Sequence, residues 1–150
     1  MSELETSWTT CSASETEEAG AAFARGLTGG TVVALYGGLG MGKTAFVRGM
    51  AAGLGLSAEV SSPTFALVHE YGGDPPFVHF DMYRVTGWDD LYTTGFFEYI
   101  DAGCILAVEW SENIEAALPP GTVRVRFTRL GDTKKEIRVL KEEGERMERP

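Results

Sequence analysis

The chain has 150 residues, of which 43% are hydrophobic and 23% charged, and its formal net charge is −9. This size predicts one domain with a conventional core, and no apolar stretch reaches the roughly 18 residues that a transmembrane helix needs. The acids before Arg25 are the reverse of the basic start of a signal peptide, and Cys11 and Cys104 lack a paired spacing, so we expect a cytoplasmic protein.

The predicted secondary structure alternates between helices and strands. In chain order it comprises a helix over 14–27, a buried strand over 31–36, a helix over 43–55, a loop that becomes a strand over 61–71, a strand over 75–81, a helix over 87–101 interrupted at Gly95, a buried strand over 104–110, a short helix over 111–118, and strands over 122–130 and 135–142. Caps and apolar residues at helical spacing indicate the helices. The run over 31–36 is apolar without alternation, which is typical of a strand covered on both faces.

This order predicts an α/β fold in a single domain over residues 1–150. We expect a mainly parallel central sheet with helices on both faces, finished by a C-terminal antiparallel strand pair. Residues 1–9 and 144–150 are expected to be frayed.

The stretch YGGLGMGKTAF fits the motif G-x-x-x-x-G-K-[ST] at every fixed position, with Gly37, Gly42, Lys43 and Thr44. The glycines allow successive backbone N–H groups to point at phosphate oxygens, and the following helix presents its positive end to the same group. Lys43 adds a cation for the outer phosphates, and the Thr44 hydroxyl is placed to bind Mg²⁺. Because a strand is predicted before the motif and a helix after it, the motif indicates the phosphate cradle of a P-loop NTPase.

Two predicted strands end in an acid, at Asp81 and at Glu109. Mg²⁺ takes oxygen ligands, and a parallel sheet binds ligands at the carboxyl ends of its strands, so we expect both carboxylates beside the cradle. The pattern leaves open which of them contacts the metal. His79 is interpreted as a packed strand histidine, and Trp110 fits either a base-stacking side chain or a core residue.

Several residue types that other nucleotide-binding classes need are missing. The chain has no glutamine, its one asparagine is Asn113, and its one basic residue between positions 49 and 123 is Arg84. A GTPase switch uses a glutamine to orient water, and a small-molecule kinase uses several cations to neutralise the transferred group. These gaps favour a compact ATP-binding unit with weak catalysis of its own, completed by a partner.

Charge is unevenly distributed along the chain. Residues 1–120 carry 16 acidic and four basic side chains, whereas residues 121–150 carry six acidic and nine basic ones. Because affinity for a nucleic-acid backbone comes mainly from cations, we expect any nucleic acid to be held by a partner. The basic C-terminal strands fit either a solvated face or a surface that orients the protein on a partner.

Four segments together resemble one family. In chain order they are GGLGMGKTAFVRGMAAGLG, SSPTFALVHEY, HFDMYR and LAVEW, and the likeness spans roughly residues 10–120. This combination is similar to the bacterial TsaE family (formerly YjeE), the ATPases of tRNA threonylcarbamoyladenosine biosynthesis. The resemblance implies a P-loop fold, ATP or ADP with Mg²⁺, and weak ATPase activity. It also implies partnership with the TsaB and TsaD proteins, which modify adenosine 37 of certain tRNAs. Because the body is acidic, we expect tRNA to be contacted only through that complex. No membrane contact is expected, since no apolar stretch is long enough.

The resemblance also implies roles for individual residues. The implied nucleotide-binding set is Ser12, Gly37, Gly38, Leu39, Gly40, Met41, Gly42, Lys43, Thr44, Ala45 and Trp110. Thr44 and Glu109 are implied as the metal contacts. Lys43, Thr64 and Asp81 are implied as the residues of hydrolysis, with Thr64 sensing the outer phosphate.

Two positions depart from the family pattern. Gly38 stands where the family commonly has an acid, and Ala45 where a second threonine is common. Ala45 lacks a hydroxyl for a phosphate contact, so we expect an altered nucleotide affinity, whereas Lys43 and Thr44 are unchanged.

Two other functions remain compatible with the sequence. A stand-alone phosphotransferase would use Asp81 as the base for the hydroxyl of a small acceptor, although the middle of the chain is poor in cations. A non-enzymatic nucleotide switch would use Thr64 to order its loop around the outer phosphate and create a docking surface.

Overall fold

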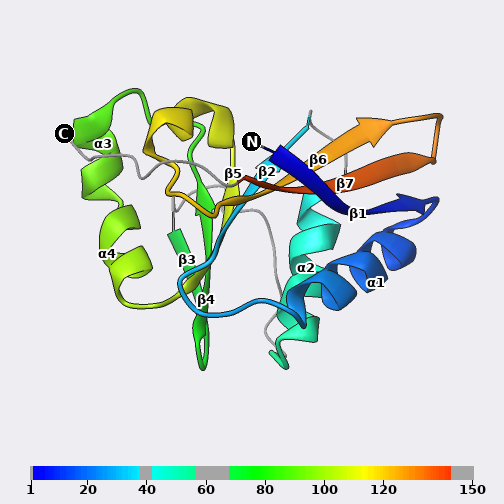
Figure 1. Ribbon diagram of the computed structural model, residues 1–150, viewed down its shortest axis with the longest axis horizontal. Helices are drawn as coiled ribbons and strands as arrows, with labels where there is room; N and C mark the ends of the chain where they lie inside the picture. The colour runs from blue at the N-terminus through cyan, green and yellow to red at the C-terminus, as the bar shows by residue number, and fades with distance from the viewer. Residues whose placement is uncertain (1, 38–41, 57–67, 143–150) are drawn as a thin grey trace.

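The computed structural model describes residues 2–37, 42–56 and 68–142 of the chain. Their elements are β1 (Ser2–Thr10), α1 (Ala13–Ala24), β2 (Val32–Tyr36), α2 (Lys43–Gly53), β3 (Val68–Gly73), β4 (Pro76–Asp81), α3 (Trp88–Thr93), α4 (Phe96–Asp101), β5 (Ile105–Glu109), the 3₁₀ helix η1 (Ser111–Ala117), β6 (Val123–Arg129) and β7 (Lys135–Glu142). Figure 1 shows the strands in one sheet with helices on both sides.

The strands lie in the order β1-β7-β6-β2-β5-β4-β3. The central strands β6, β2, β5 and β4 pair in parallel, whereas β1–β7, β7–β6 and β4–β3 are antiparallel. The predicted C-terminal antiparallel pair is confirmed. The prediction of a mainly parallel sheet is wrong, because half of these pairings are antiparallel. A parallel pairing needs a long crossover, and the short connections β3–β4 and β6–β7 allow only hairpins.

The N-terminal segment forms a strand, so the prediction that it is frayed is wrong. Residues 1–9 are expected to be frayed, but Ser2–Thr10 pairs with β7 along its length. The Trp8 side chain packs against the core that lies under α1 and α2. The buried hydroxyls of Thr10 and Thr16 are hydrogen-bonded at 2.8 Å, which ties the end of β1 to the first turns of α1.

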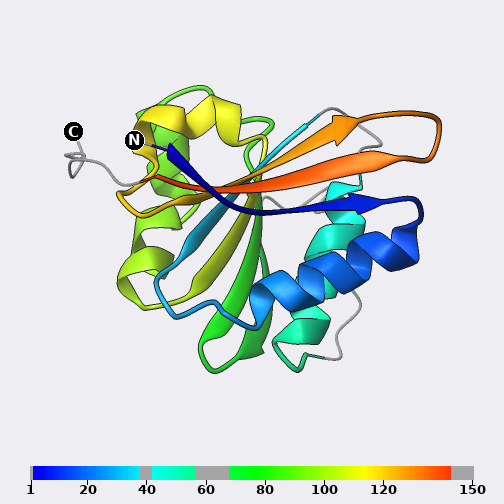
Figure 2. The ribbon, with the colours of Figure 1, turned by 45° about the vertical axis from the view of Figure 1, so that its right-hand side comes forward.

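Helices lie on both faces of the sheet, as Figure 2 shows from a second direction. A hydrophobic core lies on each face. One core lies under α1 and α2, and the other lies under α3, α4 and η1. β2 contributes Val33 and Leu35 to the first core and Val32 and Ala34 to the second. The predicted burial of this strand on both faces and the predicted helices on both faces are therefore confirmed.

Glycines bring α1 and α2 into close backbone contact. A Cβ at Gly49 would lie 2.0 Å from Glu17 O, and one at Gly20 would lie 2.2 Å from Phe46 O. Because no side chain separates the helices there, α1 determines the position of α2, whose first residue is Lys43.

The predicted interruption at Gly95 is confirmed, since this residue, with a φ of 81°, separates α3 from α4. Among the helices in the described ranges, none has the length and apolar character needed to cross a membrane. Residues 144–150, predicted to be frayed, lie outside those ranges.

Candidate functional site

The candidate site lies where the parallel strands β2, β4 and β5 end, beside the first turn of α2. Gly37 follows β2 with a φ of 144°, and Gly42, with a φ of 90°, directly precedes Lys43. Both glycines have backbone conformations that other residues adopt rarely. Five predicted site residues lie outside the described part of the chain: Gly38, Leu39, Gly40, Met41 and Thr64.

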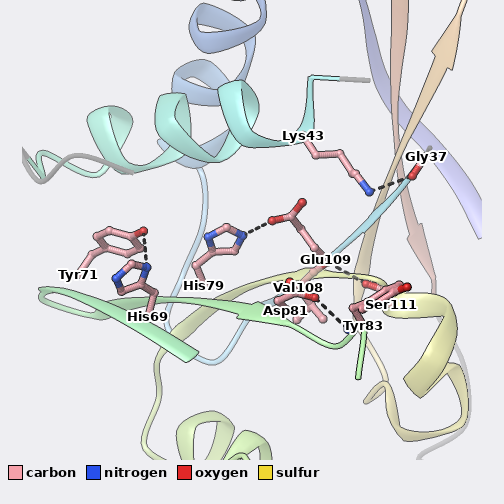
Figure 3. Close-up of polar contacts among 10 residues, drawn as sticks. All are labelled: Gly37, Lys43, His69, Tyr71, His79, Asp81, Tyr83, Val108, Glu109 and Ser111. Carbon is pink, nitrogen blue, oxygen red and sulfur yellow. Dashed lines mark hydrogen bonds and ion pairs between the residues drawn. The ribbon is translucent and has the colours of Figure 1, made fainter. Parts of the chain in front are cut away.

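The Lys43 side chain reaches back to the end of β2. The residue is 7% exposed, and its Nζ donates a hydrogen bond to Gly37 O at 2.9 Å (Figure 3). The same Nζ lies 5.5 Å from the centre of the Trp110 ring. The first turn of α2 contains no acid, so the lysine and the positive end of the helix together favour an anion at this place.

Gly42 lies close to Thr16 and Lys135, two residues that are distant from it in the sequence. A Cβ there would lie 3.3 Å from Lys135 Nζ and 3.5 Å from Thr16 Cγ2. Lys135 begins β7 and pairs with Arg129 at the end of β6, which is the edge where the parallel strands also end. Lys135 was not predicted as a site residue, because its position follows from the antiparallel pairing of β7 with β6. The available signal was the basic character of these two strands.

Asp81 and Glu109 are the last residues of the neighbouring strands β4 and β5. They are direct register partners in the parallel pair β4–β5, which agrees with the arrangement expected from the sequence. Phe77 and Ala107 belong to the core under α2, and strand alternation puts both acids on that same face. Glu109 is 6% exposed, and in Figure 3 its carboxylate extends from β5 toward α2.

His79 contacts the predicted metal ligand. Its side chain is fully buried in β4, and its Nε2 lies 2.7 Å from Glu109 Oε2. Within the described residues, His79 Nδ1 has no hydrogen-bond partner. The burial agrees with a packed strand histidine, but the contact with Glu109 was not predicted, because it depends on the register between β4 and β5.

The turn after β4 holds Asp81 and brings an aromatic pair to the site. Asp81 Oδ1 accepts a hydrogen bond from Tyr83 N at 2.9 Å. The exposed Tyr83 ring packs edge-on against Trp110 with 4.8 Å between ring centres. Trp110 has a φ of 59° and is the one non-glycine residue with positive φ in the described ranges. Such a conformation is strained, so the surrounding structure must hold Trp110 beside Lys43.

The remaining predicted site residues lie on helices. Thr44 is half-buried and Ala45 buried in the first turn of α2. Ser12 caps α1, where its Oγ accepts a hydrogen bond from Glu15 N at 3.1 Å. A contact between Ser12 and a nucleotide base stays a prediction.

A polar cluster on the other face fixes the end of β2. The Tyr36 hydroxyl donates a hydrogen bond to Glu115 Oε2, and Glu115 Oε1 accepts one from Arg124 Nη2 at 2.7 Å. The Arg126 guanidinium lies 4.7 Å from the centre of the Tyr36 ring. Burial, followed by the hydrogen bond and charge of Glu115, raises the pKa of Tyr36 above its usual range. This cluster anchors the chain directly before Gly37.

The donor chemistry at this edge suits a hard cation bound together with phosphate. In the described part of the chain, no three His, Cys, Asp or Glu side chains gather closely enough to form a metal site by themselves. The oxygen donors at this edge include the carboxylates of Glu109 and Asp81, at the ends of β5 and β4, and the Thr44 hydroxyl in the first turn of α2. Mg²⁺ is commonly held by one or two carboxylates and completes its octahedron with phosphates and water, so the residues present fit Mg²⁺ with a nucleotide.

Comparisons with known proteins agree with one another. The family model described as threonylcarbamoyl adenosine biosynthesis protein TsaE matches residues 10–137. Over 128 residues the chain is 38% identical to the tRNA threonylcarbamoyladenosine biosynthesis protein TsaE of Treponema pallidum, covering 85% of this chain and 95% of that protein. Over 131 residues it is 37% identical to the Bacillus subtilis protein of the same name, covering 87% and 82%. A crystal structure of Bacillus subtilis YdiB superposes with a TM-score of 0.78 at 33% identity, covering 94% of this chain and 87% of that one.

Proposed function

This chain belongs to the TsaE family of tRNA threonylcarbamoyladenosine biosynthesis, and from that premise we propose that it is a P-loop protein that binds ATP with Mg²⁺ and hydrolyses it slowly. One observation carries the proposal. Lys43 at the start of α2 lies at the same sheet edge as Glu109 and Asp81, which end neighbouring parallel strands.

The turn before α2 supplies the proposed phosphate contacts. Gly37 and Gly42 take positive φ values, and such backbone turns allow N–H groups to converge on an anion. Lys43 Nζ donates a hydrogen bond to Gly37 O. When a phosphate binds, the ammonium is placed to exchange this carbonyl for a phosphate oxygen, which carries more negative charge.

Thr44 and Glu109 are the residues that would hold Mg²⁺. When bound, the ion would supply charge neutralisation to the phosphate oxygens. Glu109 brings its carboxylate from β5, and Thr44 brings its hydroxyl from α2. The two ligands therefore come from opposite sides of the junction between sheet and helix.

Asp81 and Thr64 are proposed to assist hydrolysis. Asp81 would orient the attacking water, and its carboxylate is held at the end of β4 by Tyr83 N. Thr64, which would sense the outer phosphate, lies outside the described residues. Lys43 would stabilise the charge that develops on the transferred group.

Slow hydrolysis by the isolated protein follows from its few cations at the turn. Within the described residues, Lys43 donates a hydrogen bond to Gly37 O, and Lys135 Nζ would lie 3.3 Å from a Cβ at Gly42. Phosphoryl transfer accelerates strongly when a further cation stabilises the transition state. We propose that the TsaB and TsaD proteins complete the site and also hold the tRNA, because the acidic body opposes direct binding to RNA.

The test measures ATP turnover by the wild-type protein and by Lys43→Ala, each with and without TsaB and TsaD. We expect slow turnover by the protein alone, faster turnover with the partners, and none with Lys43→Ala. Lys134→Ala is the matched control, because Lys134 is exposed in the turn before β7, and it should behave like the wild type. Equal rates with and without the partners would contradict the proposal.

The same samples separate the two alternative functions. Phosphate transfer to a small metabolite without partners would favour a stand-alone phosphotransferase. Partner binding that strictly requires nucleotide, with negligible hydrolysis, would favour a nucleotide switch.

A further inference from the structure

A buried histidine lies directly beside the proposed metal ligand. His79 sits in β4 between Val78 and Phe80 and is 0% exposed. Its Nε2 is 2.7 Å from Oε2 of Glu109 on the neighbouring strand β5. Figure 3 shows His79 on one side of this carboxylate and Lys43 on the other. Nucleotide binding and hydrolysis, as proposed above, give His79 no role.

The hydrogen bonds of His79 indicate its tautomer. A carboxylate oxygen is an acceptor, so the imidazole donates from a protonated Nε2. Nδ1 has no hydrogen-bond partner in the described ranges, and a proton there would be a buried donor without an acceptor, which is unfavourable. The geometry therefore places an Nε2–H donor of His79 against Oε2 of Glu109. This hydrogen bond orients the Glu109 carboxylate.

Packing alone does not account for a histidine at this position. The inward-facing neighbours Phe77 and Ala107 belong to the apolar core under α2. An apolar side chain at position 79 would fill the same space without burying an unpaired polar atom. A role in contact with solvent does not explain the histidine either, because His79 has no accessible surface. The Nε2–H contact with Glu109 is thus the feature that distinguishes histidine from leucine here.

We propose that His79 is a positioning residue whose Nε2–H holds the Glu109 carboxylate in the orientation that a divalent cation requires. This inference rests on the proposed function, because it takes Glu109 as a ligand of Mg²⁺. Partners that hydrogen-bond to metal ligands orient them, and their loss typically lowers metal affinity by about 10–100-fold. Loss of the His79 donor should act on metal binding and leave the affinity for metal-free nucleotide nearly unchanged.

Three variants test the inference. His79→Leu removes the donor and keeps an apolar volume, whereas His79→Gln keeps an N–H donor at a similar distance from the backbone. His69→Leu is the matched control. His69 lies directly opposite His79 on β3, but its Nδ1 is 3.3 Å from the Tyr71 hydroxyl, away from Glu109.

The first readout is the affinity of the ADP-loaded proteins for Mn²⁺, measured from the paramagnetic resonance of free Mn²⁺. We expect about 10-fold or greater weakening in His79→Leu, and affinities near the wild type in His79→Gln and His69→Leu. ADP affinity in the presence of a chelator should be similar in all four proteins. Undiminished Mn²⁺ affinity in a folded His79→Leu would overturn the inference and leave the proposed function standing. Absence of Mn²⁺ binding in the ADP-loaded wild type would overturn the proposed function and the inference with it.

The second readout needs neither metal nor a folded variant. Nitrogen-15 resonance of the His79 ring in the metal-free wild type should show a protonated Nε2. A proton on Nδ1 alone would leave no donor for Glu109 and would overturn the inference directly.

Discussion

Replacing Gly49 with alanine tests whether the contact between α1 and α2 positions the proposed phosphate-binding turn. A Cβ at Gly49 would lie 2.0 Å from Glu17 O and 2.7 Å from Glu17 C, which are backbone atoms of α1. Real Cβ atoms essentially never approach such atoms within 3.0 Å. In a close-packed interior the two helices must therefore separate by about 1 Å.

Two opposing effects set the size of the change. Overpacking a well-packed core typically costs about 1–3 kcal/mol, whereas glycine to alanine inside a helix gains about 0.8–1.0 kcal/mol. Because the clash is with backbone and not with a flexible side chain, we expect a net loss in unfolding free energy of about 1–2 kcal/mol. For a protein of this size that loss lowers Tm by about 2–8 °C.

Urea titration and thermal melting measure this loss, and a fluorescent ADP derivative measures the effect on the turn. Because α2 begins at Lys43, displacement of the helix should weaken nucleotide binding as well. Gly87→Ala is the control, since a Cβ there meets no heavy atom within 4 Å. A Gly49→Ala protein as stable as the wild type would refute the reasoning.

Three further predictions concern the site and its surroundings. Lys135→Gln removes a charge beside Gly42, so calorimetry should show several-fold weaker ADP binding at low salt and a smaller difference at high salt; an equal loss in Lys134→Gln would argue against a specific contact. Tyr36→Phe removes a group whose pKa is raised by burial and by Glu115, so the folded wild type favours the neutral phenol. Wild-type stability should therefore be complete below about pH 10 and fall above it by up to about 1.4 kcal/mol per pH unit. Urea titrations between about pH 9 and 11 should show a shallower fall in the variant, and parallel curves would be the contrary result. Asp81→Asn should bind ADP like the wild type and lose ATP turnover, and unchanged turnover would remove Asp81 from the hydrolytic site.

Local sequence patterns predicted the central elements well. β2 was predicted from an apolar run without alternation, and the break between α3 and α4 from Gly95, whose φ of 81° suits glycine. The edge strand β1 could not be predicted from local sequence. Residues 2–10 contain two large apolar residues, Leu4 and Trp8, and their strand forms by pairing with β7 near the other end of the chain.

In the candidate site, too, local motifs were predictable, whereas contacts between distant segments were not. The motif located Lys43, and the two strand-end acids were expected together because parallel strands end at one edge. The burial of His79 was expected, but its contact with Glu109 and the position of Lys135 were not predicted, because both depend on strand pairing in the sheet. His79 reaches Glu109 through the register of β4 and β5, and Lys135 reaches Gly42 through the return of β7 beside β6.

The position of a bound metal tests the central claim most directly. Crystals grown with Mn²⁺ and a non-hydrolysable ATP analogue would locate the ion by anomalous scattering. We predict an anomalous peak in contact with Thr44 Oγ1 and the Glu109 carboxylate, with the outer phosphates against Lys43 Nζ. A peak elsewhere, or a nucleotide bound away from Lys43, would contradict the account.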